Sequence, residues 1–293
     1  MEITPTKLPE LSRSEALRIF GSIDKDNVLL YVEIRNNCCV SHRQEVILED
    51  AISIWPMQLH TRTFDEVRKS AILGNVKDCL EAGLRTWSGC GTKMASKGAM
   101  DWWEYIIDAS KKPGMNVSRR VYVRALACLA NAHWEQYHCR GLGQIDRIYM
   151  AGLLANACIS YGFIPPVVMG IANEIGKHLS TETIAGVDYS RFDKLTHLRD
   201  VVFKEEKQDS LQDIMANRCA APGCGVESSE KTTLLRCAGK CPMEVKPAYC
   251  CKDCQRSHWK EHRTICKAAV QHANNPNILE RASQRDINEG TNE

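Results

Sequence analysis

The sequence lacks a strong charge of either sign. Its 38 Lys and Arg residues nearly balance 36 Asp and Glu residues, which leaves a formal net charge of +2. Because the long-range field of so balanced a chain is weak, its overall charge indicates no particular partner. The sequence also has no run of five or more Lys or Arg residues, so it contains no signal of that kind for nuclear import.

An apolar signal segment is also missing. Residues 1–20 mix Glu, Lys, Arg and Pro and contain no apolar core, so we expect no secretory signal. This predicts an intracellular, reducing environment, in the nucleus or the cytoplasm, where clustered Cys and His residues are more often metal ligands than disulfides. The 15 cysteines are odd in number, so they cannot all pair within one chain.

One long stretch, residues 148–173, carries no charged residue and resembles a membrane span in composition. Asn156, Ser160 and the pair Pro165-Pro166 interrupt it. Two buried helices that meet at a turn explain this pattern better than one spanning helix. No membrane is therefore expected as a partner.

Most of the chain before residue 216 is predicted to be helical. Residues 63–66 (Thr-Phe-Asp-Glu) fit a capping box, and the helix that follows is expected to run to Leu80 and stop at Gly83. Residues 71–83 look like part of one ankyrin repeat. No second copy follows at the 33-residue period, so an ordinary amphipathic helix is the favoured interpretation. Residues 28–34 fit either a strand or the core side of a helix.

Further helices are expected over 45–55, 93–110, 118–137, 144–160, 165–178 and 192–215. Short turns between long apolar helices predict a mainly α fold of stacked, solenoid-like helical hairpins. The domain interpretation is an uncertain segment at 1–60, a helical domain at 61–215, a cysteine-rich domain at 216–268 and a tail at 269–293. The tail is polar and has no aromatic residue, so we expect it to be disordered.

The cysteines are concentrated near the C-terminus, with eight of the 15 between Cys219 and Cys266. Seven of them and one His form four close pairs, and each pair can supply two ligands from one turn, so that two pairs complete one tetrahedral site. Zinc is predicted in preference to an iron–sulfur cluster, because the series ends in His-x3-Cys. The pairs are Cys219/Cys224, Cys237/Cys241, Cys250/Cys254 and His262/Cys266.

The order of residues from Tyr249 to Cys266 is an aromatic residue, Cys-x3-Cys-Gln, a Trp and then His-x3-Cys. This order closely resembles the C-terminal half of a MYND finger, and the chain is similar to fungal-type proteins in which a helical region precedes such a finger. The first pair departs from the family, since four residues separate its cysteines where the family commonly has two. Pro222-Gly223 can absorb the extra length in a turn.

The resemblance implies a small ββα fold with two Zn²⁺ ions in a cross-brace. One ion would be held by the first and third pairs and the other by the second and fourth. Cys251 can replace Cys250 in the third pair, although the family's aromatic-Cys step favours Cys250. His258 is expected to be a surface helix residue. The cysteines outside the cluster are expected to be core residues without a redox role.

MYND fingers act mainly as protein-interaction modules, so the resemblance implies an adaptor that docks short, in some relatives proline-rich, partner peptides. Gln255 and Trp259 match the residues that line the peptide groove in such relatives, although Trp259 can equally belong to the finger's own core. Residues 218–270 hold ten Lys or Arg and five Asp or Glu, and with seven thiolates and two zinc ions their net charge would be +2. Nucleic acid is therefore disfavoured as a partner.

Two alternatives to the adaptor stay open: a transcriptional or ubiquitin-ligase cofactor, and a methyltransferase-related enzyme. Four protein ligands per zinc leave no position for a reactive water. The sequence also contains no SET-like motif and no GxxxxGK[ST], GxGxxG, HExxH or GxSxG string. We therefore expect no catalytic residue.

Overall fold

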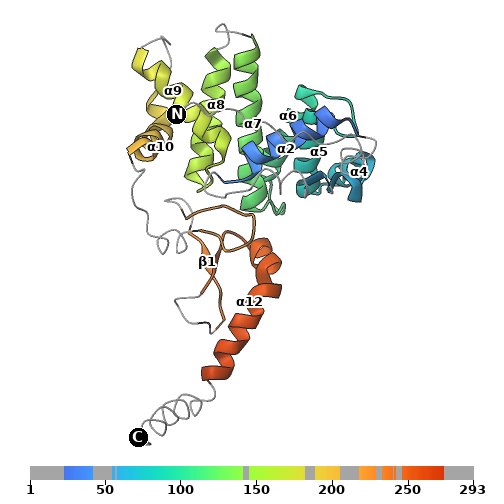
Figure 1. Cartoon of the computed structure of the whole chain (residues 1–293), viewed down its shortest axis with the longest axis vertical. Coiled ribbons are helices and arrows are strands. Elements are labelled where there is room, and N and C mark those ends of the chain that lie inside the picture. The colour runs from blue at the N-terminus through green and yellow to red at the C-terminus, as the bar shows by residue number, and fades with distance from the viewer. Residues whose placement is uncertain are drawn as a thin grey trace, which may run out of the picture. The chain divides into compact units, whose positions relative to one another are not determined.

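The computed structural model describes residues 23–41, 55–56, 58–140, 145–181, 189–204, 218–228, 233–239, 241 and 246–273. The chain divides into two compact units, residues 1–206 and residues 207–293, and each is described by itself. Among these described residues, the first unit consists of helices, and the second contains two short strands and one long helix (Figure 1). The described chain is therefore mainly helical, as predicted.

The first described helix settles the ambiguity at residues 28–34. This segment lies inside helix α2 (Lys25–Cys39), which begins at Asp24, whose side chain accepts hydrogen bonds from the backbone N–H groups of Asp26 and Asn27. Residues 28, 31 and 32 of α2 are fully buried, at the spacing of one helix face. The apolar run is thus the core side of a helix and not a strand.

Two short helices follow where the sequence predicts one. The capping box is confirmed at the start of α4 (Phe64–Ile72), where the side chains of Thr63 and Glu66 each accept a hydrogen bond from the other's backbone N–H. The chain then turns and begins α5 (Val76–Ser88). The prediction of a single helix that runs to Leu80 is therefore wrong.

The break between α4 and α5 has a local cause in Gly74 and Asn75. Gly74 adopts a φ of 92°, a conformation that glycine reaches without steric cost. The Asn75 side chain accepts hydrogen bonds from the backbone N–H groups of Lys77 and Asp78, so it caps a new helix and does not extend the old one. Residues 71–83 therefore comprise the end of α4, a turn and the first part of α5, and not the single amphipathic helix that the sequence favours.

Gly83 does not stop a helix, which corrects a second prediction. It lies inside α5, opposite Trp103 of helix α6 (Ser96–Ala109). A methyl group at Gly83 would lie 2.2 Å from the Nε1 atom of Trp103, so the missing side chain makes room for this fully buried indole. Helix α5 ends instead at Gly89, which has a φ of 78°.

The starts and described ends of the other α-helices of the first unit agree with the sequence to within a few residues, whereas the short 3-10 helix before α10 was not predicted. Consecutive helices pack on one another, α5 on α6 and α7 on α8. Pro166 occupies the first position of α9, as its missing N–H favours. These elements are α6, α7 (Arg119–Arg140), α8 (Ile145–Ser160), α9 (Pro166–Thr181), the 3-10 helix η1 (Tyr189–Phe192) and α10 (Asp193–Lys204).

Several predictions fall wholly or largely outside the described residues. They are the helix at 45–55 apart from Trp55, the end of the last helix at 205–215, and the tail beyond Ala273. The uncharged stretch 148–173, in contrast, is described and forms α8, a turn and the start of α9. Among the described helices, none combines the length and the apolar character that crossing a membrane requires.

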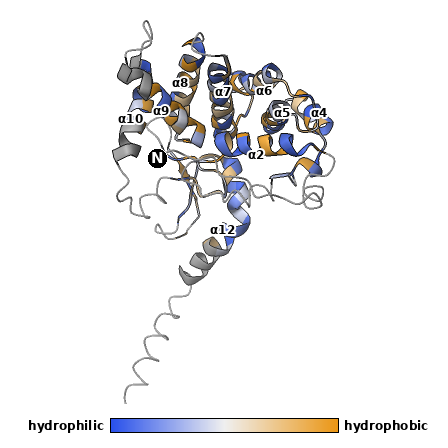
Figure 2. Cartoon of the chain, turned by 45° about the horizontal axis from the view of Figure 1, so that its top comes forward, coloured by the Kyte–Doolittle hydropathy of each residue, from blue (hydrophilic) through white to orange (hydrophobic). Residues whose placement is uncertain are grey.

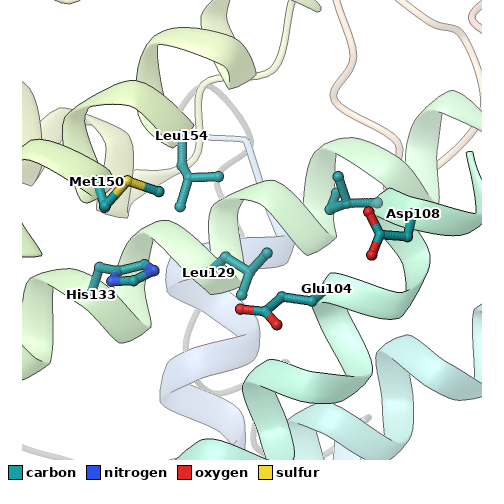
Figure 3. A pocket seen from close by; sticks show the side chains of 7 residues that line it. Glu104, Asp108, Leu129, His133, Met150 and Leu154 are labelled. Atoms are coloured by element: carbon teal, nitrogen blue, oxygen red, sulfur yellow. The ribbon is translucent and has the colours of Figure 1, made fainter. Parts of the chain in front are cut away.

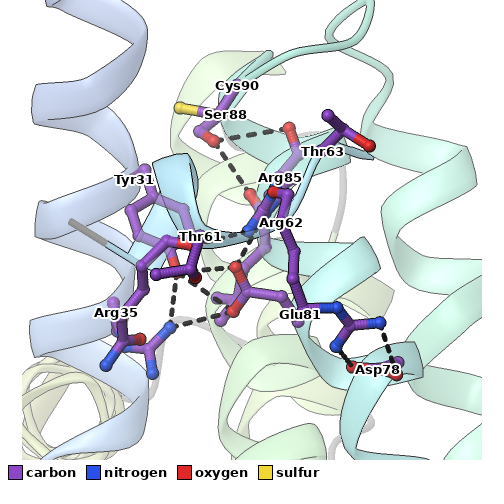
Figure 4. A network of polar contacts seen from close by, with 12 residues as sticks. Tyr31, Arg35, Thr61, Arg62, Thr63, Asp78, Glu81, Arg85, Ser88 and Cys90 are labelled. Carbon is purple, nitrogen blue, oxygen red and sulfur yellow. Dashed lines mark hydrogen bonds and ion pairs between the residues drawn. The ribbon is translucent and has the colours of Figure 1, made fainter. Parts of the chain in front are cut away.

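A partly buried polar network joins α2 to α5 (Figure 4). The Tyr31 hydroxyl donates to the Glu81 carboxylate at 2.8 Å, and the same carboxylate accepts from Arg35 at 2.9 Å and from Arg85 at 2.8 Å. Burial by itself raises the pKa of Glu81, but the two guanidinium groups outweigh burial and lower it. Glu81 is thus held as a carboxylate at the contact between these helices.

The described residues of the second unit contain little regular structure. Strands β1 (Leu235–Arg236) and β2 (Ala248–Tyr249) pair antiparallel, with Leu235 opposite Tyr249 and Arg236 opposite Ala248. Helix α12 (Lys252–Ala273) follows and is mostly hydrophilic (Figure 2). Two-residue strands and a hydrophilic helix can bury only little apolar surface. Such a surface is too small to stabilise a unit of this size by itself.

Candidate metal centre

The structure brings the first and third cysteine pairs together in one buried cluster. The Sγ atom of Cys250 lies 3.5 Å from those of Cys224 and Cys254, which are 3.6 Å from each other. The backbone N–H of Cys250 donates to the Sγ atom of Cys219 at 3.4 Å. Together the four thiols form the first cluster: Cys219, Cys224, Cys250 and Cys254.

The second and fourth pairs meet in a separate buried cluster. The Nε2 atom of His262 lies 3.3 Å from the Sγ atom of Cys237 and 3.5 Å from that of Cys241. The Sγ atoms of Cys241 and Cys266 are 3.7 Å apart. The second cluster therefore consists of Cys237, Cys241, His262 and Cys266. Pairs one and three alternate along the chain with pairs two and four, which is the cross-brace order that the family resemblance implies.

The spacing of the ligand atoms fits tetrahedral zinc. With Zn–S bonds of about 2.3 Å and Zn–N bonds of about 2.0 Å, neighbouring ligands of a tetrahedron lie roughly 3.5–3.8 Å apart. Six pairs of ligand atoms lie 3.3–3.7 Å apart, and within each cluster all four ligand atoms lie within 4.8 Å of one another. A disulfide would require about 2.05 Å. The set of four cysteines and the set of three cysteines with one histidine are therefore compatible with two zinc ions.

Comparisons of this chain with protein-family models, curated proteins and solved structures found no match. The assignment of the cysteine-rich unit therefore depends on its residues and their geometry.

A turn at Pro222-Gly223 accommodates the long first pair. The backbone N–H of Cys224 donates to the carbonyl oxygen of Ala221 at 3.1 Å, and Gly223 has a φ of 64°. Proline followed by a glycine of positive φ is the sequence that a type II turn requires. The extra residues between Cys219 and Cys224 therefore form a tight turn, and this turn directs Cys224 to the cluster.

Backbone hydrogen bonds in the hairpin region fix the positions of the first and second ligand pairs. Ala220 donates its backbone N–H to the carbonyl oxygen of Ala248 at 2.8 Å, and Cys237 donates to that of Pro247 at 2.9 Å. At the end of β2, the Tyr249 hydroxyl lies 3.1 Å from the His258 Nδ1 atom, which links the hairpin to α12. The structure thus connects all four pairs through short backbone or side-chain contacts.

The thiols of the first cluster cannot ionise independently. Hydrogen bonds from Cys224, Cys250 and Cys254 lower the pKa of Cys219, and the contact with Cys219 raises the pKa of Cys250. One thiolate is therefore stabilised by neighbours that keep their protons. A divalent cation removes this conflict, because it attracts all four sulfurs at once and releases their protons.

His262 is prepared to act as a neutral ligand. Its side chain is buried, and burial followed by the nearby His258 lowers its pKa. The uncharged imidazole therefore predominates at neutral pH, and it has a lone pair on one ring nitrogen. Its Nε2 atom is the one that faces the sulfurs of Cys237 and Cys241.

Gly239 is a residue of this site that the pair spacing alone did not reveal. Its backbone N–H donates to the Sγ atom of Cys237 at 3.4 Å. A methyl group in its place would lie 2.5 Å from the Sγ atom of Cys266. The only sequence signal was the position of this glycine between the two cysteines of a pair.

The neighbouring candidates fall outside both clusters. Cys251 is half-buried and lies 3.8 Å from Cys250, sulfur to sulfur, while Cys250 occupies the cluster. His258 is more than a surface residue, because its side chain is only 19% exposed and contacts Tyr249. Gln255 is half-buried, and Trp259 is 43% exposed. The ring of Trp259 meets His262 edge-on at 6.1 Å between centroids.

Six of the seven other cysteines are buried in the helical unit, and Cys139 is exposed. Burial raises the pKa of Cys158 and of Cys38, so these thiols stay protonated and are poor nucleophiles. The six buried thiols are Cys38, Cys39, Cys79, Cys90, Cys128 and Cys158.

Proposed function

We propose that residues 216–268 form a MYND-type finger that binds two zinc ions and docks short partner peptides. The helical unit acts as a scaffold, and the whole chain acts as an interaction adaptor. One observation supports this proposal: the four ligand pairs alternate between two buried clusters, in each of which the four ligand atoms lie within 4.8 Å of one another. The zinc ligands are Cys219, Cys224, Cys237, Cys241, Cys250, Cys254, His262 and Cys266.

The metal ions have a structural role in this proposal. The second unit has two-residue strands and a mostly hydrophilic helix, so metal binding supplies free energy that its apolar core cannot. Each ion takes four ligands from the protein, which completes a tetrahedral shell and leaves no site for a water molecule. Activity therefore resides in the surface that the zinc ions hold in shape.

The hairpin offers an edge to which a peptide can add. The far side of β2 is already used, because Ala248 accepts a hydrogen bond from Ala220. On β1, no further strand pairs with Leu235 and Arg236 within the described residues. Leu235 is 57% exposed. An extended partner segment can hydrogen-bond along this edge and cover the Leu235 side chain.

Trp259 is the second element of the proposed docking surface. Its exposed fraction of 43% shows that much of the indole is available from outside the finger. The indole is a large, flat and amphipathic surface, well suited to a proline ring. Gln255 lies one helical turn before Trp259, on the same side of α12.

Titration of the full, zinc-loaded chain with a pool of proline-containing peptides tests docking. We expect Trp259→Ala to weaken binding at least tenfold, as is common for a buried aromatic anchor. Its exposed neighbour on α12 provides the matched control, and Lys260→Ala should bind as the wild type does. Equal binding by wild type and Trp259→Ala would remove Trp259 from the site, and a pool without any binder would contradict the docking proposal.

A further inference from the structure

The helical unit contains a groove that the proposed function does not use. It lies among α6, α7 and α8 and has a volume of about 270 Å³ (Figure 3). Much of its lining is apolar, and helices α7 and α8 contribute Leu129, Met150 and Leu154. Leu129 is buried, whereas Met150 is 39% exposed, so the groove has an apolar floor and a wall that is open to solvent.

One wall of the groove is acidic. Glu104 and Asp108 are exposed, and they lie one turn apart on α6. Asp108 pairs with Lys111 at 2.9 Å, but both side chains are about two-thirds exposed. Such a pair separates at little cost. Glu104 has no ion pair with any residue in the described part of the chain. An incoming cation therefore meets two available carboxylates.

His133 places a hydrogen-bond donor in the same groove. Its Nδ1 atom lies 3.3 Å from the Arg147 guanidinium. A guanidinium can only donate, so Nδ1 accepts and the ring proton sits on Nε2. Burial, then Arg147, lowers the pKa of His133, which keeps the ring neutral. His133 is 8% exposed, and its Nε2–H has no partner among the residues that the structure describes.

We propose that this groove binds a short peptide segment in which an apolar side chain lies close to a Lys or Arg. The apolar side chain enters between Leu129 and Leu154. The cationic side chain reaches Glu104 and Asp108, and a peptide carbonyl accepts the His133 Nε2–H. The open wall suits an extended chain better than an enclosed small molecule. All of its lining residues belong to the helical unit.

Fluorescence anisotropy with the full chain tests this proposal. The probes are labelled eight-residue Gly/Ser peptides that carry one Leu or Met and one Lys or Arg, placed one to four residues apart. For the best probe, we expect Glu104→Gln with Asp108→Asn to weaken binding about five- to tenfold, because each exposed ion pair is worth roughly a two- to threefold change. Replacing the Lys or Arg of the probe with norleucine, which keeps an alkyl chain without the charge, should cause a similar loss.

Two control variants separate this groove from other surfaces. Asp101→Asn removes an exposed carboxylate of α6 outside the groove lining, and Trp259→Ala alters the finger; both should bind the probe as the wild type does. Met150→Glu places a charge at the exposed wall and should abolish binding without loss of helical signal. Absence of any binder at millimolar concentration, equal binding of the norleucine probe, or unchanged binding by Met150→Glu would overturn the proposal. The proposal would also be overturned if n-butylamine displaced the labelled probe as effectively as unlabelled peptide does, because this result would indicate a site for free amines.

Discussion

Gly239 leaves no room for a side chain beside the thiol of Cys266, since a methyl group there would lie 2.5 Å from its Sγ atom. The same residue donates its backbone N–H to the Sγ atom of Cys237. Gly239 therefore contributes to the second cluster through a hydrogen bond to one ligand and through the space it leaves for another. A substitution at Gly239 can therefore test the second cluster without changing any of its ligands.

We expect Gly239→Ala to lose the zinc of the second cluster while the first cluster keeps its own. The ligands remain, but the methyl group displaces Cys266 from its place beside Cys237. Elemental analysis should show the zinc content fall from about two to about one ion per chain. Gly98→Ala is the matched control, because a methyl group there meets its nearest neighbour at an ordinary 3.5 Å. If Gly239→Ala still bound two zinc ions per chain, the proposed clash between the methyl group and Cys266 would be refuted.

Cys250 and Cys251 provide a direct test of ligand choice, because they are adjacent and only Cys250 belongs to the first cluster. Cys250→Ser should lower the zinc content by one ion, since it leaves three strong ligands at that site. Cys251→Ser should keep both ions. Zinc content and the visible spectrum after replacement of zinc with cobalt report on each variant. The opposite pattern would assign Cys251 as the ligand.

Gly83 should tolerate no side chain, because α5 and the indole of Trp103 touch at this point. We expect Gly83→Ala to lower the free energy of unfolding of the helical unit by about 1–3 kcal/mol, the usual cost of overpacking. A glycine inside the helix with open space around it would give the reverse, a gain of about 0.5–1 kcal/mol from a better helix former. Denaturant unfolding, followed by the far-ultraviolet helical signal, distinguishes the two.

The Glu81 network should make the helical unit sensitive to acid. The pKa of Glu81 in the folded protein is below its ordinary value, so its contribution to stability is complete above the unfolded-state pKa of about 4.3. That contribution is lost as the pH falls through the folded-state pKa. Thermal denaturation of the full chain between pH 7 and pH 3 should show this loss.

Glu81→Gln is the variant that assigns this acid sensitivity to one group. At pH 7 it should cost about 2–3 kcal/mol, because Arg35 and Arg85 lose a charged partner in a poorly hydrated site. The stability difference from wild type should then shrink at acidic pH. Asp65→Asn, on the exposed surface of α4, is the control. A constant difference at every pH would show that Glu81 is not the titrating group.

The helices were predictable where capping residues and prolines mark their ends. The capping box of Thr63 and Glu66 marks the start of α4, and Pro166 marks the start of α9. The division of α4 from α5 was missed because Gly74 and Asn75 interrupt an apolar pattern that otherwise continues. The role of Gly83 was not predictable from local sequence. A glycine that ends a helix and a glycine that leaves space for an aromatic ring of a neighbouring helix look the same there.

The candidate metal centre was predictable because zinc requires few residue types at short spacing. Spacing alone identified the four pairs, and the family resemblance supplied their alternation between two sites. The half-buried position of His258 was not predictable, since it depends on a tertiary contact with Tyr249. Neither was the groove among α6, α7 and α8, because its lining is assembled from three helices.

The most direct test of the account is the zinc content of the full chain, purified without added metal or chelator, together with limited proteolysis before and after chelation. We predict two zinc ions per chain. Removal of the ions should expose residues 218–273 to rapid cleavage and leave the helical unit resistant. A chain without stoichiometric zinc, or a second unit equally resistant after chelation, would contradict the account.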